Sequence, residues 1–435
     1  MITLSLARAL AAAPAAAPTT PTPAPTARIL TLDEAVRTAR EHQPQLLVAR
    51  SSTAASEARA DEARAPLLPQ IGATAQVQRS GGPAHTASLS TIAAGRSLGP
   101  TQFLFGLTGS QLIYDFGATT GRLKAARQSV EAQRASERAT GDQVILTARS
   151  SFFIARANKD LVGVSRENLV NQDAHLRQIE GFVRLGTRPE IDLAQARTDR
   201  ANAEVQLIQS ENGYATARAQ LNQAMGIDGP ADFDVSDETL PAVDGEDAPL
   251  ETLFAEAIGL RPDVRSADRF IAADELTASA VRSQYLPSLG VAGSVNQIGP
   301  AIDQTSLGWT ATATLSWNLF QGGLTQAQAR EADATLAGAR AQALAVRQQV
   351  RVDLEQARLA VRAAKTSLGA AGEALTNARE RLRLAEGRYQ AGVGSVIELG
   401  DAQVAVTTAA AQQVQAEYNL ATSRAQLLRA LGREA

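Results

Sequence analysis

The chain is an internal duplication, and this feature limits its fold most because both halves must form the same series of elements. Near the start of each half, matching residues lie 218 positions apart, as Pro69 and Pro287 do. Towards the end of each half the spacing becomes 206, as between Gly186 and Gly392. The difference falls near segment 80–100, which is longer than its counterpart. Insertions collect in exposed loops, so we expect this segment to lie on the surface.

The duplication divides the chain into four parts. Residues 1–27 form a leader, 28–226 the first repeat, 227–249 a linker rich in Pro, Gly and Asp, and 250–435 the second repeat. The linker is expected to wrap around the middle of the molecule. The leader, rich in Ala, Pro and Thr, offers small-residue cleavage sites of a secretory signal peptide. Arg8 is its only basic residue, so a low-complexity leader without that role is the alternative.

Two long stretches lack proline, the strongest helix breaker. No proline occurs between Pro100 and Pro189, and none after Pro300. These gaps predict very long helices over 122–185 and 324–390, each about 100 Å long at the helical rise per residue. Helices of this length are far longer than those of ordinary globular proteins.

A seven-residue repeat runs along the predicted helices and is typical of a coiled-coil seam. Segments 31–66 and 190–225 are expected to stack end to end as shorter helices beside a long one. Alanine fills alternate seam positions, and aromatic residues are only 4% of the chain, which favours helices packed at close range. A soluble or periplasmic coiled-coil scaffold would share this pattern. The seam positions in segment 350–390 are Leu354, Val361, Leu368, Leu375, Leu382 and Tyr389.

Four segments alternate apolar and polar residues with a period of two, as β-strands do. Strands of about ten residues with a nearly charge-free polar face suit a transmembrane β-barrel, although a half-buried soluble sheet gives the same alternation. Trp309 and Tyr285 lie near strand ends, as in aromatic girdles. The four segments are 70–78, 102–114, 288–296 and 309–319.

The alternation assigns the two faces of the predicted sheet. Val291, Ala313 and Leu315 are expected to face lipid, and Thr312 and Thr314 the lumen. Four strands cannot close a barrel, and an open edge is forbidden in lipid because its backbone groups would lack hydrogen bonds. Several chains must therefore share one barrel. Three chains would give twelve strands, but this argument does not fix the number.

The chemistry-bearing residues point away from catalysis. A net charge of −3 gives no basic patch for nucleic acid. The chain has no cysteine, and His42, His85 and His175 lie far apart, so no metal-spacing motif exists. No phosphate-binding loop, HExxH or GxSxG motif occurs. We therefore expect no enzyme activity and no cofactor.

In order and spacing, the duplicated motifs resemble those of the TolC-like outer-membrane efflux protein family. The resemblance covers nearly the whole chain from residue 29. Its motifs are LTLDEAVRTAREHQPQL (30–46), RAPLLPQIG (64–72), LIYDFG (112–117), YLPSLG (285–290), LSWNLFQGG (315–323), RYQAGVGSVIELGDAQ (388–403) and QLLRALG (426–432).

The resemblance implies a mainly α-helical fold with a small β part. Long antiparallel coiled-coil helices would form an α-barrel, and four strands per chain would join a shared 12-stranded transmembrane β-barrel. The protein would be a homotrimer in the outer membrane of a Gram-negative bacterium, in contact with its lipid and spanning into the periplasm. Its partners would be a periplasmic adaptor protein and an inner-membrane pump, in drug efflux or type I secretion. Lacking cysteine, the chain departs from the lipidated branch.

The two turns between the coiled-coil helices are the candidate functional sites. An ordinary helix–helix connection is the alternative, since glycine commonly ends helices. The resemblance implies that the turns form the periplasmic tip that meets the adaptor. The residues carried over are Leu185, Gly186, Thr187, Asp192 and Leu193 in the first turn, and Gly392, Val393, Gly394, Glu398 and Leu399 in the second.

The helix before the second turn is the predicted moving part of a gate. Gly387, Gly392 and Gly394 cluster there and lower the cost of backbone rearrangement. Arg388 and Tyr389 are expected, with Glu386, to make polar contacts that hold the closed state. Glu380 and Glu386 could line the constriction, or equally lie on a solvated outer face.

Overall fold

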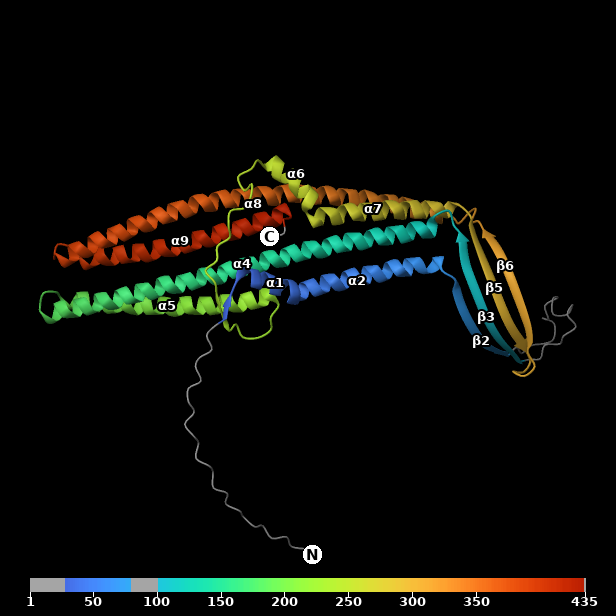
Figure 1. Ribbon diagram of the computed structural model, residues 1–435, viewed down its shortest axis with the longest axis horizontal. Coiled ribbons are helices and arrows are strands. Elements are labelled where there is room, and N and C mark those ends of the chain that lie inside the picture. The colour runs from blue at the N-terminus through green and yellow to red at the C-terminus, as the bar shows by residue number, and fades with distance from the viewer. Residues whose placement is uncertain (1–27, 80–100, 434–435) are drawn as a thin grey trace, which may run out of the picture.

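The computed structural model describes residues 28–79 and 101–433. It is a long, narrow bundle of helices with a small β-sheet at one end (Figure 1). The first half contains β1 (Arg28–Leu30), α1 (Leu32–His42), α2 (Pro44–Arg64), β2 (Gln70–Arg79), β3 (Thr101–Tyr114), α4 (Ala118–Arg184) and α5 (Glu190–Met225). The second half contains β4 (Phe233–Val235), α6 (Leu250–Leu260), α7 (Pro262–Arg282), β5 (Ser288–Gly299), β6 (Ser306–Ser316), α8 (Leu324–Gln390) and α9 (Val396–Leu431).

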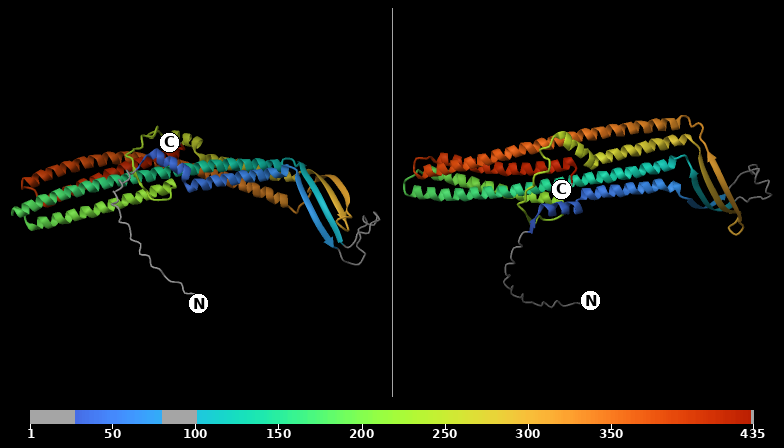
Figure 2. Two further views of the ribbon diagram at one scale, coloured as in Figure 1. Left: turned by 60° about the horizontal axis from the view of Figure 1, so that its bottom comes forward. Right: turned by 45° about the horizontal axis from the view of Figure 1, so that its top comes forward.

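The two very long helices are confirmed. α4 and α8 each have 67 residues and run along the bundle, as the views in Figure 2 also show. Each pairs with a following helix of 36 residues, α5 or α9, into a hairpin whose turn lies at the end away from the sheet. The leader 1–27 and the loop 80–100 lie outside the described residues. No helix in the described part is long and apolar enough to cross a membrane.

The prediction of one continuous helix over 31–66 was wrong. The segment is broken into α1 and α2 at Gln43, which has ψ 120° and precedes Pro44. The second half breaks likewise at Arg261 before Pro262. A residue before proline is pushed out of the helical region because the proline ring clashes with its backbone. A short 3₁₀ turn, Ala65–Leu67, then leads from α2 towards β2.

The coiled-coil seam between α8 and α9 is confirmed. Leu354 and Val361 are fully buried in one core cluster, and Leu375 packs with Ala378 and Ala409 further along. Nearest the turn, Tyr389 packs with α9 residues of the same seam. Buried apolar side chains every seventh residue hold the hairpin together along its length.

The four strands form one antiparallel sheet in the order β2-β3-β5-β6. Because β3 and β5 are neighbours, the two repeats join at the middle of the sheet, and β2 and β6 are its edges. The strand predicted over 309–319 runs instead from Ser306 to Ser316. Trp317 has already left the ladder, and its indole Nε1 donates to the carbonyl oxygen of Tyr285 at 3.0 Å.

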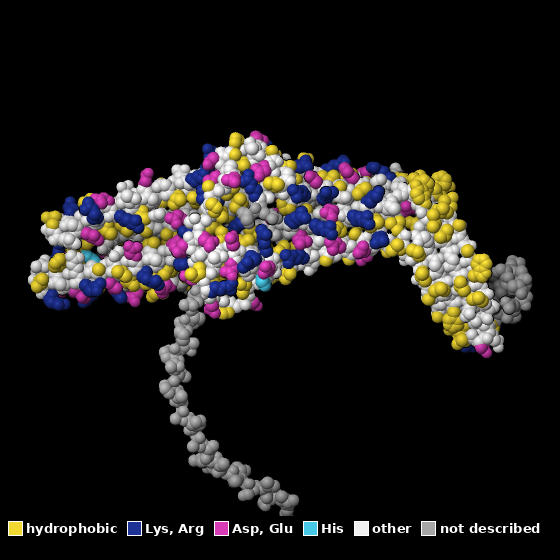
Figure 3. All heavy atoms as spheres, in the orientation of Figure 1, with side chains coloured by type: hydrophobic (Ala, Val, Ile, Leu, Met, Phe, Trp, Pro, Cys, Tyr) yellow, Lys and Arg dark blue, Asp and Glu magenta, His cyan; other side chains and the backbone are white. Residues whose placement is uncertain are grey.

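The register places apolar residues of all four strands on one face. Val291 pairs with Ala313, and Leu289 with Leu315. Polar residues share the other face, where the hydroxyls of Ser294 and Thr310 lie 2.8 Å apart. Figure 3 shows few charged side chains on the sheet, whereas both charges cover the helices. The apolar face comprises Ile71, Ala73, Ala75, Val77, Phe103, Phe105, Leu107, Val291, Val295, Trp309, Ala311, Ala313 and Leu315.

The linker crosses the middle of the bundle as a belt, which we define as residues 226–249 (Figure 1). Its strand β4 pairs in parallel with β1. Basic side chains from the long helices hold the belt by donating to its carbonyl oxygens. Lys159 Nζ lies 2.7 Å from the oxygen of Val235, and Arg424 Nη1 lies 2.9 Å from that of Leu240.

Gly226 joins α5 to the belt at a position where only glycine fits. Its φ is +73°, and an added Cβ would lie 2.6 Å from the carbonyl oxygen of His42. We expect Gly226→Ala to lower the free energy of unfolding by about 1–3 kcal/mol, the usual cost of backbone strain. Thermal unfolding followed by circular dichroism in detergent measures this.

Gly163→Ala is the matched control. Gly163 lies inside α4 with open space around its Cα, so alanine should stabilise the helix by up to about 1 kcal/mol. Equal unfolding temperatures for the two variants would contradict the assigned strain.

Candidate functional site

Both hairpin turns close with the same backbone geometry. Gly186 has φ +72° and Gly392 has φ +75°, the left-handed conformation that glycine adopts after a helix. The N–H of Thr187 donates to the carbonyl oxygen of Phe182 at 3.0 Å, and that of Val393 to the oxygen of Arg388 at 3.1 Å. The duplication thus produces two equivalent tips.

The predicted tip residues divide into exposed and buried groups. Leu185 is 77% exposed and Val393 is 72% exposed, so each turn presents one large apolar side chain on its surface. Gly186, Thr187 and Gly392 are also exposed, Leu193 and Glu398 are half-buried, and Asp192, Gly394 and Leu399 are buried.

Buried tip residues support the turns from inside. An added Cβ on Gly394 would lie 2.9 Å from the backbone nitrogen of Tyr389, so the chain passes too close for a larger residue. Leu399 is 3% exposed in the cluster around Tyr389. These buried residues therefore set the conformation of the turn and are not available on its surface for contact with a partner. Ser395 caps α9 by accepting a hydrogen bond from the N–H of Glu398 at 3.1 Å.

Within the chain, the gate candidates have different partners. Arg388 pairs with Glu398 at 3.4 Å, and both belong to the second hairpin. Glu380 pairs with Arg383 one turn along the exposed surface of α8, and Glu386 is exposed. Exposure in a single chain fits both the constriction and the outer face, so the role of Glu380 and Glu386 stays a prediction.

Tyr389 is the gate candidate that joins the two hairpins. It is 2% exposed and lies 5.6 Å from the ring of His175 and 6.5 Å from that of Phe182, both on α4. The guanidinium of Arg188, in the first turn, lies 4.6 Å from the centre of the Tyr389 ring. Tyr389 makes these contacts through its aromatic ring. Its hydroxyl group is buried and has no hydrogen-bond partner.

Sequence reasoning missed His175, Phe182 and Arg188 as partners of Tyr389. A signal was present. Phe182 is the only aromatic residue between Phe153 and Tyr214, and Tyr389 is the only one between Phe320 and Tyr418. In helices built on alanine, a lone aromatic residue just before each turn indicates a local packing layer.

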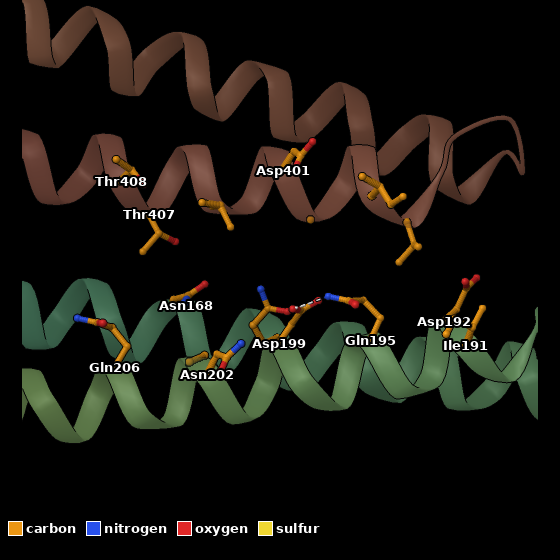
Figure 4. A pocket seen from close by; sticks show the side chains of 16 residues that line it. Asn168, Ile191, Asp192, Gln195, Asp199, Asn202, Gln206, Asp401, Thr407 and Thr408 are labelled. Atoms are coloured by element: carbon orange, nitrogen blue, oxygen red, sulfur yellow. Dashed lines mark hydrogen bonds between the residues drawn. The ribbon is translucent and has the colours of Figure 1, made fainter.

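A groove of about 600 Å³ lies between the two hairpins beside the tips (Figure 4). α5 and α9 form its walls, and Asn168 and Gln172 of α4 also line it. Ile191 and Ile397, equivalent residues of the two repeats, are each 71% exposed at its tip end. Further from the tip its lining is polar, with Gln195 donating to Asp199 at 2.9 Å. The groove could receive an extended partner segment with an apolar end.

Comparison with known proteins identifies the class to which this fold and tip geometry belong. The model of the outer membrane efflux protein family matches residues 35–227 and 253–433. The chain belongs to this family and is an outer-membrane protein. Membership does not favour the alternative of a soluble scaffold.

Individual relatives are distant. The chain is 23% identical to the outer membrane efflux protein BepC of Brucella suis, over 57% of this chain and 54% of that protein. It thus spans about half the length of that relative. It is 24% identical to the pyoverdine export outer membrane protein OpmQ of Pseudomonas putida, over 92% and 85%. The Campylobacter jejuni CmeC outer membrane channel shares the fold, with a TM-score of 0.81, 18% identity, and 92% and 85% coverage.

Proposed function

We propose that three copies of this chain assemble into one export channel, with a shared β-barrel in the outer membrane and the helices extending into the periplasm. The open sheet carries this proposal. It has one apolar face and two edges, β2 and β6, whose backbone groups need partners in lipid. Twelve strands from three copies would close the barrel with an even strand number.

The duplication supplies the expected contact between copies. Inside the chain the repeats join through β3 with β5 and through α4 with α7. The equivalent elements are β6 and α8 of one copy, and β2 and α2 of the next. These elements lie on the two opposite sides of the folded chain, where the chain itself supplies no further neighbour for the sheet edges.

The pairing in the middle of the sheet gives a register for this contact. Gly109 pairs with Gly293 inside the chain, before the irregularity between Leu112 and Tyr114. When the apolar faces of β3 and β6 are matched, the repeat equivalents of this pair are Ala313 and Ala75. The same antiparallel register brings Ala313 opposite Ala75 of the next copy. Both residues lie on the apolar face, so the join would continue that face without a break.

A cysteine pair tests this register, since the chain has no cysteine of its own. Cross-strand neighbours approach within about 5.5 Å, a distance that a disulfide spans. Oxidation of the Ala313→Cys, Ala75→Cys double variant should link the chains into a covalent trimer on a denaturing gel. Ala313→Cys combined with Gln76→Cys places the thiols on opposite faces and should not link. Products larger than a trimer, or no product from the first pair, would refute the arrangement.

The apolar face is proposed to contact lipid, as expected for Val291, Ala313 and Leu315. Leu315 lies one residue from the end of β6, beside the helices. In the proposed barrel this position is near the membrane surface and not near the middle of the hydrocarbon layer. Ala311, at the middle of the strand, is therefore the more sensitive position on this face. Thr312, next to it, faces the other side.

Arginine at the two neighbouring positions should have different effects. Ala311→Arg places a charge near the middle of the hydrocarbon, at a cost of about 2–4 kcal/mol. We expect it to reduce the yield of assembled trimer in the outer membrane. Thr312→Arg should assemble normally and shift ion selectivity in a planar bilayer. Equal yields would show that the faces are assigned wrongly.

We also propose that the tips bind a periplasmic adaptor protein that links the channel to an inner-membrane pump. Support comes from the exposed Leu185 and Val393 at the turns and from the groove beside them. A trimer would present six such tips, suiting a six-membered adaptor ring. The channel would export substrates without chemical change. OpmQ is named for pyoverdine export, which favours a small molecule over a secreted protein.

Charged tips should abolish export without preventing assembly. In cells that depend on this channel, the Leu185→Asp, Val393→Asp double variant should accumulate ethidium. Burying unpaired charges at an apolar contact costs about 2 kcal/mol or more, roughly 30-fold in affinity. Val170→Asp is the control, because Val170 is 58% exposed on α4 away from the turn. Normal export by the double variant would exclude the tips as the docking site.

A further inference from the structure

A buried histidine lies in the contact between the two hairpins. The described residues contain His42 and His175. His42 is exposed on α1, whereas His175 on α4 is only 8% exposed. Histidine is the residue whose ordinary pKa, about 6.5, brings a change of charge near physiological pH.

Residues of α5, α8 and α9 surround His175 or lie next to it in this contact. Its ring lies edge-on to that of Tyr389, 5.6 Å away at 64°. One turn back on α4, Gln172 Nε2 donates to Gln403 Oε1 of α9 at 3.0 Å, and Gln172 Oε1 is buried without a hydrogen-bond partner. These are the side chains that tie α4 to the tip half of the second hairpin.

Burial is the main cause that favours neutral His175. The guanidinium of Arg188 already occupies the Tyr389 ring, so a histidinium would bring a second cation to the same ring. Burial lowers the pKa of His175, while Asp199 of α5 acts in the opposite direction. Asp192 of α5 is the carboxylate that acts on Tyr389. The α9 contribution, Gln403, is uncharged.

We propose that His175 makes the contact between the two hairpins sensitive to acid, so that its protonation separates the α4–α5 tip from the α8–α9 tip. A buried histidinium beside the Tyr389 ring, which already holds the Arg188 guanidinium, gains solvation when the hairpins part, and this gain opposes the attraction of Asp199. The periplasm takes the pH of the external medium, so external acid would reach this residue.

The direction of the effect follows from the lowered pKa in the packed state. With His175 neutral, the contact is fully stable above the ordinary histidine value of about 6.5. As the pH falls below that value, the separated state binds a proton that the packed state resists, and the contact weakens. Each unit of difference between the two pKa values multiplies the ratio of separated to packed tips by up to about ten.

Distance measurement between the tips tests the proposal directly. Thr187 and Val393 are equivalent exposed turn residues, and spin labels on Thr187→Cys and Val393→Cys report the separation of the two turns. Labelled chain co-assembled with excess unlabelled chain restricts the signal to pairs within one chain. Between pH 7.5 and 5.5 the distribution should shift towards longer distances by double electron–electron resonance.

Four variants separate His175 from other causes. His175→Gln should abolish the shift, whereas His42→Gln and Tyr389→Phe should keep it, because His42 is exposed and the Tyr389 hydroxyl has no partner. If His175→Gln already separates the tips at pH 7.5, His175→Phe supplies an uncharged ring instead. A shift that persists in the uncharged variants, or no shift in the unaltered sequence, overturns the proposal.

Resting conductance in a planar bilayer adds a readout that rests on the proposed channel function. It should rise at pH 5.5 in the unaltered sequence and stay constant in His175→Gln. A distance shift that requires His175 supports the inference even without a conductance change. In that case it is the channel proposal that fails.

Discussion

The close packing of alanine-spaced helices is the contact on which the rest of the structure depends. A helix of 67 residues satisfies its own backbone hydrogen bonds, but it remains straight and in place only if another helix covers its apolar stripe. In the second hairpin, Leu354, Val361 and Leu375 alternate with alanines to form that stripe. This packing separates the sheet from the tips by the whole length of α4 and α8, so that membrane and periplasmic contacts lie at opposite ends.

A second set of contacts holds the hairpins to the belt. The belt is acidic, and basic residues of the helices meet its carbonyl oxygens and carboxylates. Burial alone would raise the pKa of Glu246, but hydrogen bonds from Lys365 and Arg424 bring it below the usual range. Asp234 shows the same net lowering, through Tyr214 and Lys159. Ion pairs and hydrogen bonds to charged groups thus hold the middle of the molecule together, whereas a small layer of aromatic contacts joins the tips.

The difference between the contacts at the belt and those at the tips indicates which part of the hairpins is expected to move. At the belt, several ion pairs and backbone hydrogen bonds act together. At the tips, Tyr389, His175, Phe182 and Arg188 form one layer of ring contacts, without a hydrogen bond to the Tyr389 hydroxyl. The distal halves of the hairpins, which share fewer polar contacts, are therefore the parts proposed to separate while the middle stays closed.

The sequence by itself determined the long helices, the strands and the duplication, because these depend on local patterns. Proline gaps located α4 and α8, and alternation located β2 and β5 to within a few residues. It also identified both turns, since glycine after a helix has a local cause. The break at Pro44 was readable from the proline itself, because a residue before proline is disfavoured in a helix.

Only the tertiary structure decided which residues meet across the two hairpins. Tyr389 was expected to make polar contacts with its neighbours in sequence, but its ring instead contacts residues of α4 and the first turn, some 200 positions away. Arg388 and Glu398 were expected to serve different sites, yet they form one ion pair. The contacts of Tyr389 depend on how the two hairpins lie against each other, and the Arg388–Glu398 pair depends on how α9 folds back along α8. A periodic pattern fixes the face of a helix that is buried, but not the partner that covers it.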